Sequence, residues 1–148
     1  MLTSLLYVSR SRLELPRQEV EVDAIVAASL PRNRQLDITG ALVFTERHFA
    51  QYFEGPRASV DELMASIRRD PRHHDIDVVL ERELAARRFA AWAMAYAGPS
   101  TFVAGNVLPL TDSLPQAQQI KASERLIELM RQFVDAHLAA QRRDGGRG

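Results

Sequence analysis

The sequence of 148 residues contains no cysteine, which excludes disulfides, thiolate metal sites and cysteine nucleophiles. It has no excess charge of either sign, with 19 basic and 19 acidic residues, so no overall field indicates nucleic acid or an anionic membrane. The apolar stretch within residues 1–14 is too short for a membrane span and lacks the basic start of a signal peptide. The GxGxxG, Walker and GxSxG motifs are also missing, so nicotinamide-dependent, NTPase and hydrolase functions lack support. We therefore expect a cytoplasmic protein with no nucleic-acid or membrane partner.

The composition that is present, 46% hydrophobic and 26% charged, is typical of a soluble globular protein. The length suits one domain with its own core. Two stretches with apolar residues at helical spacing lie among five strand-like segments. The first of these helices should start near Pro16 and end at Pro31, and the second should run from about Arg57 to Asp70. The strands are predicted within residues 2–9, 37–55 (two strands around a turn near Glu46), 75–83 and 90–98.

This order, βαββαβ followed by an added strand, predicts an α+β protein with a ferredoxin-like fold. In that fold strands one and three lie side by side at the centre of the sheet, and both helices cover one face. With the added strand the sheet would be mixed and five-stranded. A meander with helices at one end is the weaker alternative, because the strands alternate with helices.

The C-terminal part of the chain differs in character from residues 1–98. Residues 99–142 are predicted to form a Pro/Gly/Ser/Thr-rich linker to about Pro115 and a helix from about Ala117 to Arg142, and residues 143–148 a disordered tail. The sheet face carrying Leu6 and Tyr52 is apolar and cannot be covered by the first two helices. We expect the C-terminal helix or a partner subunit to cover it, and this second apolar face favours a homodimer.

The stretch "HFAQYFEGP" places Gln51 on the same strand face as Phe49 and Phe53. If strands one and three are neighbours, Tyr7 can face Gln51, with Ser29 on the inward side of the first helix and Asn33 just past the end of that helix nearby. One interpretation is a buried hydrogen-bonded pair with no further role. The other is a pocket between the two helices for a planar ligand that forms hydrogen bonds, because a phenol and an amide form a donor–acceptor relay.

Five motifs, in order and in register, resemble the BLUF family of blue-light sensors that use FAD. They are "SLLYVS", "NRQLDITG", "QYFEG", "RRDPRHHD" and "RRFAAWAM", and they extend from about Leu2 to Tyr96. The chain resembles short, stand-alone members of this family. The resemblance implies non-covalent FAD, with FMN or riboflavin possible in its place, and a flavin ring between the two helices. The implied cofactor-binding residues are Ile25, Ser29, Arg32, Asn33, Gln51, Ile67, Asp70, Arg72 and His73.

The resemblance also implies a photocycle. Tyr7 would give an electron and a proton to the excited flavin through Gln51, and the amide would remain rearranged after recombination. Trp92 and Met94 match the semi-conserved pair of the fifth strand, and the tryptophan occupies either an inward or an outward position in the family. One departure is Arg32, which stands where several members carry His or Asn.

The family would make the protein a photoreceptor and not an enzyme. Its signal would leave through the fifth strand and the C-terminal helices to a separate protein partner acting in trans. Two alternatives are a flavin-dependent redox enzyme and a flavin-free interaction module on the same fold. The sequence "RHHDID" offers His73, His74, Asp75 and Asp77, but the histidines are expected on a loop and no third anchored ligand is evident, so we expect no metal.

Overall fold

A computed structural model describes residues 2–12, 19–45, 47–97, 105–111 and 114–145. Its elements follow the predicted order of strands and helices. Their bounds are β1 (Leu2–Ser11), α1 (Glu19–Gln35), β2 (Thr39–Phe44), β3 (His48–Pro56), α2 (Arg57–Arg69), β4 (His73–Leu84), β5 (Trp92–Ala97), the 3-10 helix η1 (Leu108–Thr111) and α4 (Gln116–Gly145).

The sheet has the strand order β4-β1-β3-β2-β5. The first four strands in this order form an antiparallel unit with β1 and β3 paired at its centre, which confirms the predicted α+β class. β5 does not belong to this antiparallel unit. It pairs in parallel with β2 alone, with a register irregularity between Leu42 and Val43. β5 is therefore an irregular edge strand, attached to an otherwise antiparallel sheet.

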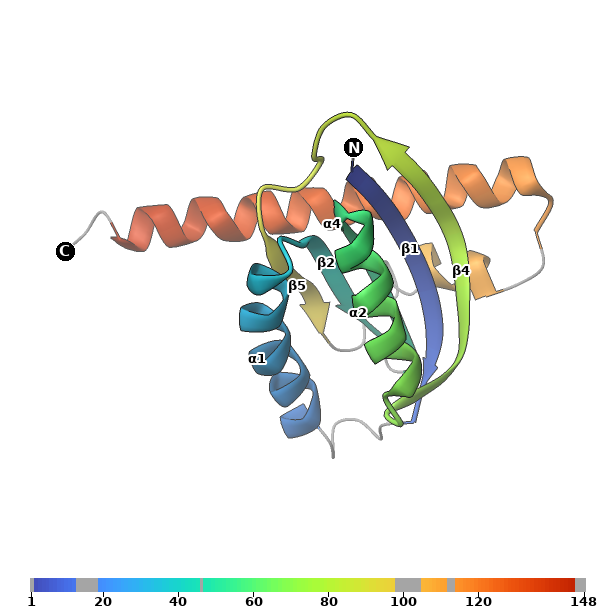
Figure 1. Cartoon of the computed structure of the whole chain (residues 1–148), viewed down its shortest axis with the longest axis horizontal. Helices are drawn as coiled ribbons and strands as arrows, with labels where there is room; N and C mark the ends of the chain where they lie inside the picture. The colour runs from blue at the N-terminus through green and yellow to red at the C-terminus, as the bar shows by residue number, and fades with distance from the viewer. Residues whose placement is uncertain (1, 13–18, 46, 98–104, 112–113, 146–148) are drawn as a thin grey trace.

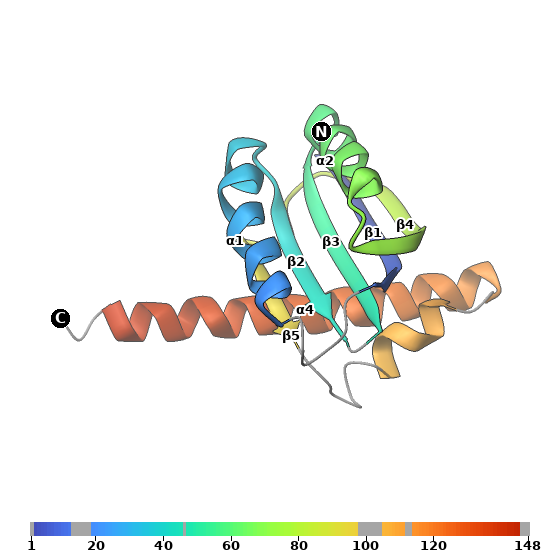
Figure 2. The ribbon, with the colours of Figure 1, turned by 90° about the horizontal axis from the view of Figure 1, so that it is seen from below.

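The sheet separates two apolar clusters. α1 and α2 lie on one face and α4 crosses the other, as the two views show (Figures 1 and 2). The apolar stripe of α2 is buried against the first face: it consists of Val60, Leu63, Met64 and Ile67. On the other face α4 contributes Leu126, Ile127, Met130 and Val134 to a cluster that also holds Leu6, Val8, Ala50 and Tyr52. The C-terminal helix thus covers the second face within one chain.

One glycine is required where β2 meets β3. Gly40 has φ +148°, and a Cβ there would lie 2.0 Å from the carbonyl oxygen of Tyr52. No side chain fits so close to a neighbouring backbone. Close packing of β2 against β3 is therefore the reason why the motif "DITG" ends in a glycine.

Pro31 does not end α1, contrary to the prediction. It is exposed within the helix, which continues to Gln35, so Asn33 lies on the helix and not beyond it. Proline removes one backbone donor but does not prevent the next turn from forming its own hydrogen bonds. After it, the N–H groups of Leu36 and Ile38 donate to the carbonyls of Arg32 and Asn33, at 3.0 and 2.8 Å.

The C-terminal region is also more ordered than predicted. Residues 105–107 are helical and lead into η1, and Val107 and Leu110 are buried beside α4. Two apolar side chains spaced three apart were enough to dock this short stretch, despite its loop-like composition. α4 continues to Gly145, past the predicted end at Arg142. The rest of the predicted disordered tail, residues 146–148, lies outside the described residues.

Candidate functional site

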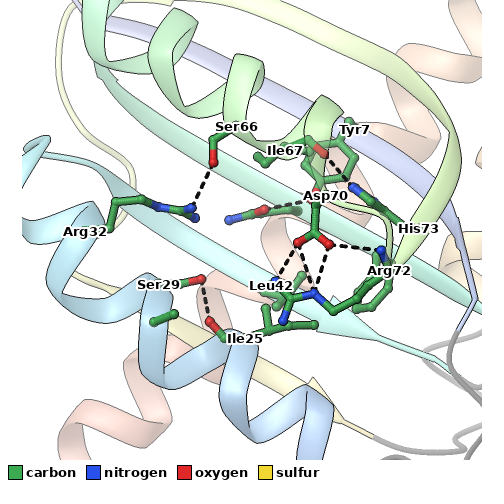
Figure 3. A pocket seen from close by; sticks show the side chains of 13 residues that line it. Tyr7, Ile25, Ser29, Arg32, Leu42, Ser66, Ile67, Asp70, Arg72 and His73 are labelled. Atoms are coloured by element: carbon green, nitrogen blue, oxygen red, sulfur yellow. Dashed lines mark hydrogen bonds and ion pairs between the residues drawn. The ribbon is translucent and has the colours of Figure 1, made fainter.

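A cavity lies between α1, α2 and the sheet, at the place predicted for a ligand. Figure 3 shows side chains from both helices and from the strands around it. Nine of the predicted site residues line it: Tyr7, Ile25, Ser29, Arg32, Gln51, Ile67, Asp70, Arg72 and His73. The predicted residue Asn33 does not line it, and the lining residues that the sequence reasoning missed are Ala28, Leu42, Phe49 and Ser66.

Tyr7 and Gln51 form the central contact of this cavity. They are direct partners in the antiparallel pairing of β1 and β3, and the Tyr7 O–H donates to Gln51 Oε1 at 2.8 Å. Both side chains are at most 5% exposed. Burial raises the pKa of Tyr7, the Asp70 charge raises it further, and the Arg32 charge opposes them. The phenol therefore keeps its proton throughout the neutral and mildly alkaline range.

Asn33 is a buried amide with no partner. It follows the lining residue Arg32 on α1, is fully buried, and has no hydrogen bond at either Oδ1 or Nδ2. An unsatisfied buried donor or acceptor costs about 1–3 kcal/mol, and such groups are rare in folded proteins. A donor and an acceptor side by side, both unused, match a ligand edge that presents a carbonyl next to an N–H.

Arg32 extends from α1 toward α2 across the cavity (Figure 3), where its Nη1 donates to Ser66 Oγ at 3.3 Å. Its Nε is buried without a partner. On the same helix the Ser29 hydroxyl donates to the Ile25 carbonyl at 2.7 Å. Ile25 lies on α1 and Ile67 on α2, so the cavity has an aliphatic side chain on each side and polar groups at its edges.

At the end of α2, Asp70 and Arg72 form a rigid fork. Arg72 Nε and Nη2 donate to the Asp70 carboxylate at 2.9 and 2.6 Å, and the Arg72 backbone N–H donates to it at 3.0 Å. Burial acts to raise the pKa of Asp70, but the hydrogen bonds and charge of Arg72 hold that pKa below its usual value. The pair lines one end of the cavity with an anchored cation–anion unit.

His73 begins β4 and does not lie on a loop, as the sequence prediction had placed it. Its Nε2 lies 2.8 Å from the Ile67 carbonyl and its Nδ1 lies 2.7 Å from Ser9 Oγ. Because a carbonyl only accepts, Nε2 carries a proton and donates to it. His73 thus connects the strand that carries Tyr7 with the helix that carries Ile67. β4 starts before the predicted position at Asp75, because His73 and His74 pair with Ser11 and Arg10 of β1. Both histidines are therefore strand residues and not loop residues.

Trp92 is buried on the α1–α2 side of the sheet, in the apolar cluster that includes Tyr7, Leu42 and Phe53. Its Nε1 has no hydrogen-bond partner, and it does not line the cavity. The backbone of Met94 pairs with Leu42, while its side chain lies outside the described residues. The missed residue Leu42 also pairs with Gln51 across β2 and β3, so cross-strand register was the signal that could have found it.

The sequence profile of BLUF, "Sensors of blue-light using FAD", matches residues 2–95, which is most of the described sheet and both helices of the cavity. This chain belongs to the BLUF family. The predicted identification and the predicted flavin cofactor of the family are therefore confirmed.

The curated relatives of this BLUF chain are longer than it is. The chain is 33% identical over 135 residues to the blue light- and temperature-regulated antirepressor BluF of Escherichia coli (strain K12), covering 90% of itself and 33% of that protein. It is 34% identical over 116 residues to the photoactivated adenylate cyclase subunit beta of Euglena longa, covering 78% of itself and 13% of that protein. The chain thus spans at most a third of the length of these two relatives.

Among solved structures, BlrB, a BLUF protein in its dark state, matches with a TM-score of 0.67 and 34% identity. The match covers 85% of this chain and 94% of BlrB. A photo-activated state of BlsA matches with a TM-score of 0.70 at 22% identity, and this match supports a shared fold only. Within the described residues, no group of three or more His, Cys, Asp or Glu could hold a metal, and no helix is long and apolar enough to cross a membrane.

Proposed function

We propose that this BLUF chain is a blue-light photoreceptor that holds FAD non-covalently in the cavity between α1 and α2. The single observation that carries the proposal is the Tyr7–Gln51 hydrogen bond on the floor of that cavity. A hydrogen-bonded pair with a purely structural role would be enclosed by the core and inaccessible to a ligand. Tyr7 and Gln51 instead both line a cavity. FMN or riboflavin would meet the same ring contacts.

The residues fit a flavin ring on the evidence of their unused polar atoms. Asn33 offers a buried acceptor and donors without partners, as the carbonyl and imide edge of a flavin requires. Ile25 and Ile67 would lie against the two faces of the ring, and Ser29 and Arg32 would flank it from α1. Asp70, Arg72 and His73 would hold the outer ring edge and the ribityl-phosphate side at the end of α2.

When bound, the flavin absorbs blue light and becomes an acceptor for one electron and one proton. Tyr7 is suited to supply both, because its phenol is protonated and its O–H already donates to Gln51 Oε1. The Tyr7 proton would pass along this hydrogen bond to Gln51 Oε1 while the Gln51 amide nitrogen gives up a proton toward the flavin, and both protons would return when the electron does. Rotation of the Gln51 amide exchanges the positions of its donor NH2 group and its acceptor oxygen. The same intact amide can therefore make a different set of hydrogen bonds after the rotation. Gln51 would then be a two-position switch whose rearranged state shifts the absorption slightly to the red.

The output would pass from Gln51 to β5 and then to α4. β5 carries Trp92 and Met94, and α4 packs on the far face of the same sheet. We infer a separate protein partner acting in trans and no enzymatic activity in this chain, because a flavin ring held between α1 and α2 would leave little room for a substrate or a hydride donor beside it. A homodimer would have to use a surface other than the second sheet face, since α4 covers it.

The test is an absorption spectrum of the purified protein in the dark, directly after blue light, and through dark recovery. We expect a flavin spectrum that shifts slightly to the red and returns. Gln51→Ala should retain flavin and lose the normal shift. An unaltered photocycle in this variant would contradict the switch role of Gln51, and bound flavin that only bleaches in the wild-type protein, or that NADPH reduces rapidly, would favour the redox enzyme. A colourless protein that takes up no flavin on reconstitution would favour the interaction module.

A further inference from the structure

Glu54 is a fully buried carboxylate on the sheet face opposite the cavity, three residues after Gln51 on β3. Its Oε1 accepts from the backbone N–H groups of Arg88 and Phe89, at 2.8 and 2.7 Å, and from Thr39 Oγ1 at 3.2 Å. Its Oε2 accepts from the Tyr52 O–H at 2.8 Å. A buried carboxylate is costly unless donors surround it, and here four donors converge on one group.

The two backbone donors belong to the connection between β4 and β5, residues 85–91, which passes over the end of the sheet (Figure 1). Arg87 holds the same connection from its exposed side. Its Nη1 donates to Thr39 Oγ1 at 2.8 Å, and its Nη2 forms an ion pair with Asp37 at 2.9 Å. Phe89 is buried and packs on Tyr52, with ring centroids 5.0 Å apart.

This anchoring extends to the residue before Trp92. The Gly40 N–H donates to the Ala91 carbonyl at 3.1 Å, and β5 begins at the next residue. Residues 87–91 are therefore attached to β2 and β3 along their length. The side chain of Trp92 has no hydrogen bond of its own to hold it, because its Nε1 lacks a partner. Apolar packing in the cluster with Tyr7 and the anchoring of the backbone before it are therefore what hold Trp92 in place.

We propose that Glu54 is a positioning residue for Trp92: its carboxylate holds the β4–β5 connection and so keeps the indole buried on the flavin side of the sheet. The role of Trp92 in a photocycle rests on the function proposed above, but the positioning itself does not. The same connection also contacts α4, since Arg88 Nη1 lies 3.1 Å from Glu124. Glu54 thus holds one segment that touches both the flavin-side cluster and the output helix.

Glu54→Gln is the informative change, because glutamine has nearly the same shape. Its oxygen can still accept from Arg88, Phe89 and Thr39, but as neutral hydrogen bonds, which are roughly half as strong as those to a carboxylate. Its NH2 group would face the Tyr52 O–H, so two donors would oppose each other until one turns away. The connection should loosen while the fold remains.

The measurement uses Trp92 itself, because it is the single tryptophan of the chain. Acrylamide quenching of its fluorescence is recorded for the full chain in the dark, well below the unfolding temperature. We expect the quenching constant to be measurably higher in Glu54→Gln than in the wild-type protein, because weaker hydrogen bonds let the connection move away from the sheet more often and expose the indole. Glu83→Gln is the matched control, since Glu83 is an exposed carboxylate of β4, and it should quench like the wild-type protein.

Thr39→Val provides a second variant in case Glu54→Gln does not fold. It is isosteric and removes one donor to Glu54 and one acceptor of Arg87, so it should raise quenching in the same direction by a smaller factor. Wild-type quenching in every folded variant of this pair would overturn the positioning role. This readout needs no light. A wild-type protein without a photoshift would overturn the photoreceptor proposal, but the quenching measurements would still test the positioning role of Glu54.

Discussion

The sheet face beneath α1 and α2 and the face beneath α4 both bury polar side chains, but they satisfy them differently. On the first, the Nε of Arg32 has no hydrogen-bond partner at an open cavity, and the amide of the next residue, Asn33, is also buried without a partner among the described residues. On the second, Glu54 has four donors around it, although the Ser123 hydroxyl of α4 is buried there without a partner among the described residues. Unused polar atoms at a cavity indicate a ligand, whereas a fully bonded buried carboxylate indicates a structural role.

The two tyrosines at the centre of the sheet give the largest test of this comparison. Tyr7 and Tyr52 lie on adjacent strands but on opposite faces. Tyr7→Phe should bind flavin and lose the reversible photoshift completely, because the electron and proton donor is gone. Tyr52→Phe removes the same oxygen on the α4 side and should keep the photoshift. The measurement is the light-minus-dark spectrum, and a wild-type photocycle in Tyr7→Phe would remove Tyr7 from the mechanism.

The two faces also differ in what an unpaired polar atom should do. Asn33→Ala should weaken flavin binding by about 10- to 100-fold, since hydrogen bonds made only to the ligand are lost. The free energy of unfolding of the flavin-free chain should stay within about 1 kcal/mol, because the amide had no partner to lose. Fluorescence titration with FAD and urea unfolding measure the two quantities.

Ser123 on α4 is the matched control for Asn33. Its hydroxyl is also buried without a partner among the described residues, but it lies on α4, on the sheet face opposite α1 and the cavity. Ser123→Ala should leave both flavin affinity and stability nearly unchanged. Equal losses of flavin affinity in the two alanine variants would show that the effect of Asn33 is indirect.

The contact between the two faces can be tested through Glu124 of α4. Arg88 of the β4–β5 connection lies 3.1 Å from its carboxylate, and Arg82 of β4 lies 2.9 Å from it. Both pairs are partly exposed, so each should contribute at most about 1 kcal/mol to stability. If the signal passes through the connection, Arg88→Ala should diminish the light-dependent change in amide exchange of α4, and Arg82→Ala should not. The same response in both variants would place the route elsewhere.

The smallest expected effect concerns Asp70 at the end of the cavity. Burial opposes its ionisation, but Arg72 lowers the pKa of the folded state below that of the unfolded state. A carboxyl with a lowered pKa stabilises the fold above its unfolded pKa, near about 4, and this contribution disappears as the pH falls through the folded pKa. Asp70→Asn should therefore lower the melting temperature at pH 7 and have no effect by about pH 2.

Asp61→Asn on α2 serves as the control for this acid titration. Asp61 forms an exposed i,i+4 ion pair with Arg57 at 3.8 Å, and such pairs contribute little. Melting curves of both variants between pH 2 and about 7 compare the two. A constant difference between wild-type and Asp70→Asn at all pH values would mean that the charge of Asp70 is not what stabilises the helix end.

Local patterns were enough to predict several elements of this fold. The stripe of α2 and the Asp70–Pro71 end of that helix came from helical spacing and proline chemistry. The pairing of β1 with β3, and with it the Tyr7–Gln51 contact, came from the order of strands and helices. The end of the first helix was predicted wrongly at Pro31, because a proline removes only one backbone donor. The turn after it is held by hydrogen bonds from the N–H groups of Leu36 and Ile38, further along the chain.

By itself, the sequence determined the α+β class, the family and most of the polar residues around the cavity, because periodicity, motif order and residue chemistry are local properties of the chain. Only the tertiary structure decided that α4 covers the second sheet face and that Trp92 is buried on the face that carries α1, α2 and the cavity. It also decided that Glu54 receives the backbone of Arg88 and Phe89, which lie 34 and 35 positions away. Such partners leave no periodic signal, since backbone N–H groups are present at nearly every residue and only folding selects which of them meet a carboxylate.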